Sequence, residues 1–192
     1  MSSLARRRLP QLLCLALLLA GPRVAHASAK EFVLSLQPAF ALVYQTNPNQ
    51  TRSTVFGGGG GIDFSYGVSE SLAVRVTGAW TAHALGATTT TPAGVLQAYH
   101  AGAGITYLFD VLRLVPYIDF SIGLLGTARP GTSGRTDISN QFGLQVGVGV
   151  DYLINRTVAV GFVVRYHVYL TSLTQIPAYL YLGPRVAFHF GG

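Results

Sequence analysis

Residues Thr157 to Leu170 read TVAVGFVVRYHVYL, and this stretch decides the fold. Its residues alternate between two sets, as in a β-strand whose side chains point to opposite faces. The uncharged set is Val158, Val160, Phe162, Val164, Tyr166, Val168 and Leu170, whereas Arg165 and His167 share the other set with Ala159 and Gly161. The stretch exceeds the globular strand of about 5–6 residues and covers the about 9–11 residues that cross a bilayer. It therefore predicts a wall between lipid and a narrow lumen.

The first residues, 1–27, have the composition of a secretory signal peptide. A basic start at Arg6 to Arg8 is followed by the apolar run Leu12 to Ala20 and by the small-x-small pattern that ends at Ala27. These three features together are typical of a cleaved export signal. Cleavage is expected after Ala27 or Ala29.

The remaining residues, 28–192, predict one domain. Four arginines lie in the leader, so its removal lowers the formal charge from +6 to +2, which argues against nucleic-acid binding. The single cysteine, Cys14, also lies in the leader, and this excludes disulfides and zinc-thiolate sites from the processed chain. Charged residues make up only 10% of the sequence, against about 25% in soluble domains.

Eight segments of the processed chain alternate with period two. They are Glu31 to Tyr44, Val55 to Tyr66, Leu72 to Ala84, Leu96 to Phe109, Val115 to Thr127, Asn140 to Tyr152, Thr157 to Leu170 and Pro177 to Phe190. Long polar connections alternate with short ones, and the fourth long connection, Thr171 to Ile176, is the shortest of its kind. This asymmetry predicts an all-β fold, an eight-stranded antiparallel up-and-down transmembrane β-barrel.

Aromatic residues on the lipid-facing set gather near both ends of the predicted strands. Near the long loops they are Phe40, Tyr44, Phe56, Trp80, Tyr99 and Phe142, and near the short turns they are Phe32, Phe64, Tyr66, Tyr107, Phe109, Tyr152 and Phe190. Two such girdles are typical of membrane barrels.

Two strands contain unusual residues. Pro38 cannot donate a ladder hydrogen bond, so a bulge is expected there. Gly57 to Gly61 are followed by Ile62 and Asp63 rather than by Lys and Ser or Thr, so a phosphate-binding loop is not indicated. The glycines instead predict tight coiling and room for long side chains opposite them.

The whole pattern resembles the small outer-membrane β-barrel proteins of Gram-negative bacteria, the class of the OmpA transmembrane domain. The last segment, Gly183 to Phe190, resembles the aromatic-terminated strand that the barrel assembly machinery reads, although Gly191 and Gly192 follow here. The resemblance implies export across the inner membrane, a location in the outer membrane, and contact with its lipids and lipopolysaccharide. A monomer is expected.

Six charged residues fall on the predicted lumen side. They are Asp63, Arg75, Asp119, Asp151, Arg165 and Arg185, three acids and three arginines. A narrow interior does not tolerate unpaired charges, so a balanced set of ion pairs is expected. Asp63 and Arg75 should lie nearly opposite each other across the turn from Val68 to Ser71, within one pair of register. These groups could gate the lumen or simply fill it, and filling is favoured because eight strands leave little space.

Three lumen-facing histidines, His83, His100 and His167, are predicted near the loop rim, with His83 and His100 at similar heights. They could bind a metal, but no inward acid accompanies them, so ordinary lumen residues are the favoured interpretation and no metal or other cofactor is expected. No serine lies near them on the same face. The acyl-transfer or deacylation chemistry of some lipid A-modifying barrels is therefore not favoured, and no catalytic residue is assigned.

The favoured function is thus a non-enzymatic outer-membrane barrel with a mainly structural role. A narrow small-solute channel resembling OmpW is the alternative. Adhesion or binding through the polar loops is a further possibility that the sequence leaves open.

Overall fold

The structure, a computed structural model, describes residues 29–46, 52–86, 93–109, 113–131, 135–170 and 179–191. The predicted signal peptide lies outside the described residues. The described part is entirely β-structure and turns, and none of its segments is a helix long and apolar enough to span a membrane.

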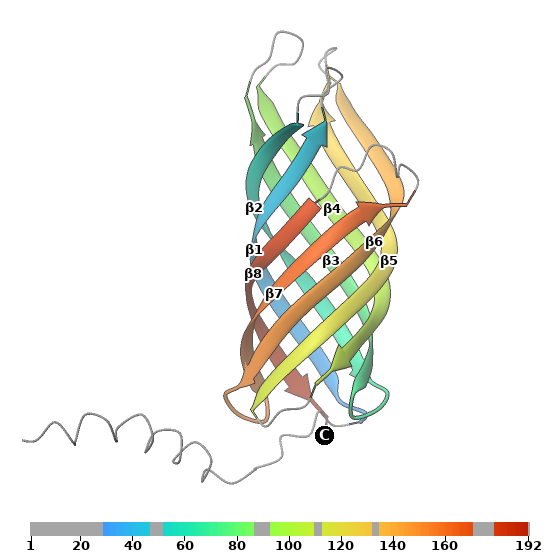
Figure 1. The fold of residues 1–192 in the computed structure, drawn as a ribbon, viewed down its shortest axis with the longest axis vertical. Helices are drawn as coiled ribbons and strands as arrows, with labels where there is room; N and C mark the ends of the chain where they lie inside the picture. The colour runs from blue at the N-terminus through green and yellow to red at the C-terminus, as the bar shows by residue number, and fades with distance from the viewer. Residues whose placement is uncertain are drawn as a thin grey trace, which may run out of the picture.

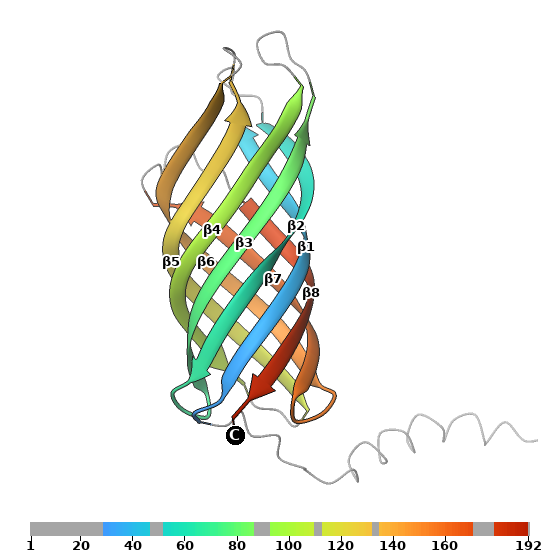
Figure 2. The ribbon, with the colours of Figure 1, turned by 180° about the vertical axis from the view of Figure 1, so that it is seen from behind.

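Eight antiparallel strands form a closed barrel in which each strand pairs with its neighbours in sequence and β1 pairs with β8. Figures 1 and 2 show the strands winding around the barrel axis from opposite sides. The strands are β1 (Phe32–Thr46), β2 (Arg52–Gly67), β3 (Leu72–Leu85), β4 (Gly94–Leu108), β5 (Leu114–Pro130), β6 (Thr136–Leu153), β7 (Val158–Tyr169) and β8 (Tyr179–Phe190). The predicted fold class is therefore confirmed. We call the end that carries the three β2–β3, β4–β5 and β6–β7 connections the turn end, and the opposite end the loop end.

Several strands extend further toward the loop end than the sequence predicted. β5 continues to Pro130 and β6 begins at Thr136, where Arg129 pairs in register with Asp137. Backbone hydrogen bonds extend this ladder through polar residues, and hydrophobic alternation could not reveal them.

The last hairpin differs in the opposite direction. β7 ends at Tyr169 and β8 begins at Tyr179. The interval between these two strands is the longest in the barrel, whereas the sequence predicted the shortest connection at the loop end. In Figure 1, β7 and β8 accordingly end below the other strands at the loop end. The expected loop Thr171 to Ile176 lies outside the described residues.

The bulge expected at Pro38 is absent. The register between β1 and β2 runs unbroken from Phe32 opposite Tyr66 to Thr46 opposite Arg52. On the other side of β1, pairing with β8 pauses between Leu36 and Phe40 and resumes in the same register. Pro38 therefore interrupts only the ladder between β1 and β8. The ladder between β1 and β2 stays complete.

The two faces of the barrel differ as the alternation predicted. Outward side chains are apolar and exposed, including Phe56 at the loop end and Phe190 at the turn end, both in the predicted girdles. Inward positions are buried and mainly small or polar. The glycines of β2 make room for them, since a Cβ on Gly61 would lie 2.8 Å from Tyr181 Oη.

Candidate functional site in the barrel lumen

Four charged side chains meet inside the barrel and form what we call the charge cluster: Asp63 of β2, Arg75 of β3, Asp119 of β5 and Arg165 of β7. Arg165 Nη2 lies 2.5 Å from Asp63 Oδ2, and its Nε lies 3.1 Å from Asp119 Oδ2. Arg75 Nη1 lies 2.6 Å from Asp119 Oδ2, and its Nη2 donates to Oδ1 at 3.0 Å. Two arginines and two carboxylates leave the cluster without net charge.

The predicted pair of Asp63 and Arg75 is offset by one inward position. Asp63 stands opposite Thr77 and Arg75 stands opposite Ser65. Arg75 Nη1 is consequently 3.9 Å from Asp63 Oδ2, and the shorter contacts of both residues go to Asp119 and Arg165.

Two buried glutamines complete the hydrogen bonds of the charge cluster. Arg165 Nη1 donates to Gln37 Oε1 at 2.6 Å, and Gln37 Nε2 donates to Asp63. Gln145 Nε2 donates to Asp119 Oδ1 at 3.1 Å. Buried charges are tolerated only when they are paired and hydrogen-bonded, and these amides meet that requirement.

A glycine on β6 leaves space for the charge cluster. A Cβ on Gly147 would lie 2.5 Å from Asp119 Oδ1 and 2.8 Å from Arg165 Cγ. Any larger residue at this position would therefore displace the ion pair.

The remaining two charged residues form a separate pair nearer the turn end. Arg185 of β8 donates from Nη1 to Asp151 of β6, and its guanidinium carbon lies 5.0 Å from the centre of the Tyr117 ring. All six predicted charged residues are thus buried inside the barrel, in two groups rather than one.

The three histidines are buried inside the barrel rather than exposed at its rim. His83 and His100 are not at similar heights, because His83 stands opposite Leu96 and His100 opposite Ala79, four positions apart along the hairpin. His100 and His167 come together with ring centres 4.9 Å apart. His167 Nε2 contacts Gln145 Oε1 at 3.1 Å and His83 Nε2 contacts Thr81 Oγ1 at 3.0 Å, and both partners are neutral. Neither ring nitrogen of His100 has a hydrogen-bond partner among the described residues.

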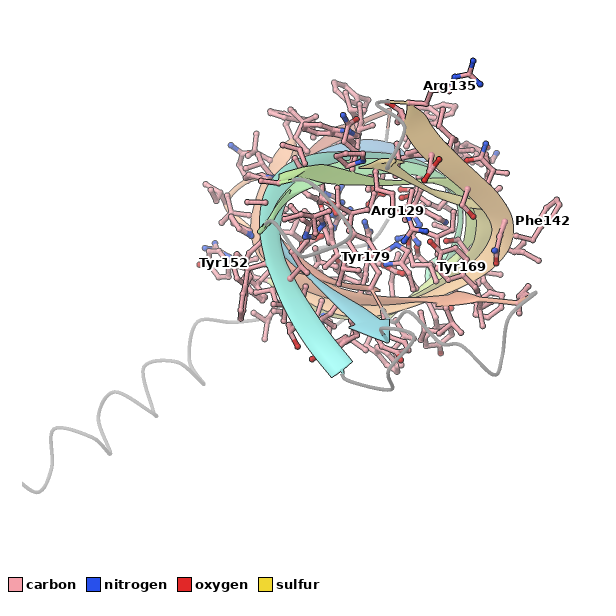
Figure 3. All side chains as sticks on the ribbon, turned by 90° about the horizontal axis from the view of Figure 1, so that it is seen from above. Arg129, Arg135, Phe142, Tyr152, Tyr169 and Tyr179 are labelled. Atoms are coloured by element: carbon pink, nitrogen blue, oxygen red, sulfur yellow. The ribbon has the colours of Figure 1, made fainter. Side chains whose placement is uncertain are left out.

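Tightly packed side chains fill the loop-end half of the lumen. Tyr181 and Tyr179 are buried, and Tyr181 Oη donates to the backbone oxygen of Gln37 at 2.8 Å. Leu96 packs in the same cluster of buried side chains, and Leu125 is also buried. The view along the axis in Figure 3 shows Tyr179, Tyr169 and Arg129 projecting inward, whereas Phe142 and Tyr152 project outward.

The turn-end half is hollow. A cavity of about 940 Å³, which we call the turn-end cavity, reaches from the turn residues around Arg113 and Arg156 to Arg75 and Arg165 of the charge cluster. The cavity therefore extends from the turn end to the charge cluster.

The described residues contain no group of three or more His, Cys, Asp or Glu side chains arranged to hold a metal ion. A hydroxyl does contact a histidine, since Thr81 Oγ1 lies 3.0 Å from both His83 Nε2 and Tyr179 Oη. The sequence-based prediction considered serine alone, so it did not include this threonine. Thr81 and His83 are both 0% exposed, so neither reaches solvent.

A closed barrel with an apolar exterior and a polar interior defines the class of membrane-spanning β-barrels. Residues 12–179 match the family described as outer membrane protein beta-barrel domain, and the chain belongs to this family. A comparison with curated proteins found no match.

Solved structures share the fold at low identity. Neisserial surface protein A is 19% identical with a TM-score of 0.63, covering 83% of this chain and 97% of that one. Ail, the attachment invasion locus protein of Yersinia pestis, is 13% identical with a TM-score of 0.60, covering 85% and 100%. OprG from Pseudomonas aeruginosa is 14% identical with a TM-score of 0.56, covering 88% and 100%. At these identities the likeness concerns the fold alone.

Proposed function

We propose that this outer-membrane barrel has a mainly structural role and does not conduct solutes. The charge cluster carries this proposal, because two ion-paired arginines and two glutamines occupy the lumen where the turn-end cavity stops. The packed tyrosines beyond the cluster close the remaining half. An eight-stranded barrel leaves an interior that side chains can fill, which agrees with this arrangement.

We further propose that residues 1–27 direct export and are removed, and that the barrel assembly machinery inserts the rest as a monomer. The exposed aromatic residues at both strand ends suit contact with membrane interfaces, and the apolar band between them suits acyl chains. The partners proposed for the outer surface are therefore lipids and lipopolysaccharide.

Planar-bilayer recording tests the closed lumen. Purified wild-type protein should insert without discrete current steps, whereas a Tyr179→Ala/Tyr181→Ala/Arg165→Ala variant, if it folds, should conduct because both closures are removed. Regular steps from the wild-type protein would contradict the proposal.

A narrow small-solute channel is the second candidate, favoured by the turn-end cavity, which already crosses part of the barrel. In this case the charge cluster acts as a gate, and Arg75→Ala should raise the conductance. In the structural case, Arg75→Ala should lower the folding yield without opening a path, since Asp119 loses two contacts. Unchanged yield together with unchanged conductance would exclude any role for Arg75 in closing or stabilising the lumen.

We propose no enzymatic activity, because the hydroxyl–histidine contact of Thr81 and His83 is fully buried. Lipid A mass spectra should be identical with and without expression of the protein. A new lipid A species that disappears in a His83→Ala variant would contradict this.

A further inference from the structure

We propose that the turn-end cavity binds a small soluble organic anion whose carboxylate or phosphate group is held by arginine and tyrosine side chains. The proposal goes beyond the structural role and does not require that the barrel conducts. It rests on the size of the cavity, on its unpartnered donors and on the charge around its mouth.

The size and lining of the turn-end cavity suit a small molecule. Its volume of about 940 Å³ lies within the range of about 300–1,000 Å³ for ligand pockets. Val33, Leu108 and Val115 supply apolar wall, while Arg75, Arg185 and Tyr117 supply polar groups. A ligand with both an apolar and an anionic part would match this lining.

Donor groups of the lining residues lack partners among the described residues. These donors are Arg75 Nε, Arg185 Nε and Tyr117 Oη, on side chains that are 4%, 9% and 3% exposed. The buried unpartnered acceptors among the described lining residues are Asp151 Oδ1 and His189 Nε2, whose ring already contacts Glu31 through Nδ1. Donors therefore exceed acceptors, and a ligand that satisfies them must carry acceptor oxygens.

Arg185 and Tyr117 are already held in place for such a ligand. Arg185 uses Nη1 for Asp151 and lies against the Tyr117 ring, which leaves its Nε edge free. A side chain that is fixed before binding loses little conformational entropy when the ligand arrives.

The mouth of the cavity carries additional positive charge. Arg113 and Arg156 are exposed lining residues, and no ion pair among the described residues involves either of them. The deeper arginines of the lining are neutralised, Arg185 by Asp151, and Arg75 and Arg165 within the charge cluster. The excess positive charge at the mouth is therefore that of Arg113 and Arg156 over Glu31. This excess of positive charge raises the local concentration of anions at the mouth of the cavity.

Side-chain NMR of arginine Nε–H groups in lipid nanodiscs tests the proposal. The processed protein in zwitterionic nanodiscs is titrated with inorganic phosphate, acetate or butyrate, and with sodium chloride at equal ionic strength. The Arg75 and Arg185 signals should shift saturably with the oxyanions and not with chloride. Butyrate should bind roughly tenfold tighter than acetate, because its two extra CH2 groups are buried at about 0.8 kcal/mol each.

Exposed residues allow a variant that keeps the fold. Arg113→Gln/Arg156→Gln should weaken binding by roughly two- to tenfold through the lost attraction, whereas Arg129→Gln at the loop end should leave it unchanged. Arg185→Gln/Asp151→Asn should weaken it by roughly tenfold or more, since a charge-assisted hydrogen bond is removed while the buried pair stays neutral.

Three results would overturn the proposal. They are the absence of saturable shifts with every oxyanion, equal shifts with chloride, and saturation of the signals by phosphatidylglycerol nanodiscs without added anion. The last would assign the group to a lipid headgroup rather than to a soluble molecule.

Discussion

The two halves of the lumen differ in how tightly their side chains pack. Both contain buried polar atoms without a partner among the described residues, such as His100 Nε2 in the loop-end half and Tyr117 Oη in the turn-end half. In the loop-end half, Tyr181 and Thr81 bond to other protein groups within a packed interior. In the turn-end half, Tyr117 and Arg185 border a cavity and keep unpartnered donors. The charge cluster lies between the halves. One barrel thus combines a packed core with an open space whose volume is in the range of ligand pockets.

The largest effect is expected at the centre of the charge cluster. Arg165→Ala should lower the free energy of unfolding by about 3–5 kcal/mol, because Asp63 and Asp119 would remain buried without their shared partner. Urea unfolding in lipid vesicles, followed by tryptophan fluorescence, measures this change.

Arg129→Ala is the matched control for Arg165→Ala. It removes the same charge from an exposed side chain at the loop end and should change the unfolding free energy by less than about 0.5 kcal/mol. Equal losses in the two variants would show that net charge, and not the buried contacts of Arg165, determines the stability.

A smaller effect is expected from crowding the charge cluster. Gly147→Ala should cost roughly 1–3 kcal/mol, because the new Cβ would lie 2.8 Å from Arg165 Cγ. Gly58→Ala is the matched control, since its nearest atom, the Ala39 backbone oxygen, is 3.7 Å away. The same unfolding assay compares them, and a neutral Gly147→Ala would mean that the cluster can shift to accommodate a methyl group.

The period-two alternation of eight segments, clearest in Thr157 to Leu170, together with the alternating connection lengths, predicted the barrel and sorted side chains between lipid and lumen. A strand turns successive side chains to opposite faces, so membership of a face follows from counting residues. The strand ends at the loop end were less predictable, because the ladder that pairs Arg129 with Asp137 depends on backbone hydrogen bonds and not on hydrophobicity.

The partners across the lumen could not be predicted from the sequence. Asp63 and Arg165 lie on β2 and β7, which are not neighbours, and Asp119 on β5 meets Arg75 on β3 although β4 lies between these strands. Such contacts depend on the tilt and shear of the closed barrel, which no single hairpin reveals. For the same reason the sequence showed Gln37 on the inner face without showing that it bonds to Arg165.

The smallest effect comes from a matched pair of hydroxyl deletions, one in each half. Tyr181→Phe should cost about 0.5–1.5 kcal/mol, because the buried backbone oxygen of Gln37 loses its donor. Tyr117→Phe should be nearly neutral, since its hydroxyl has no partner among the described residues and borders the turn-end cavity. Urea unfolding measures both variants against wild type. A larger loss for Tyr117→Phe would mean that the turn-end half is held together by its polar groups as firmly as the loop-end half.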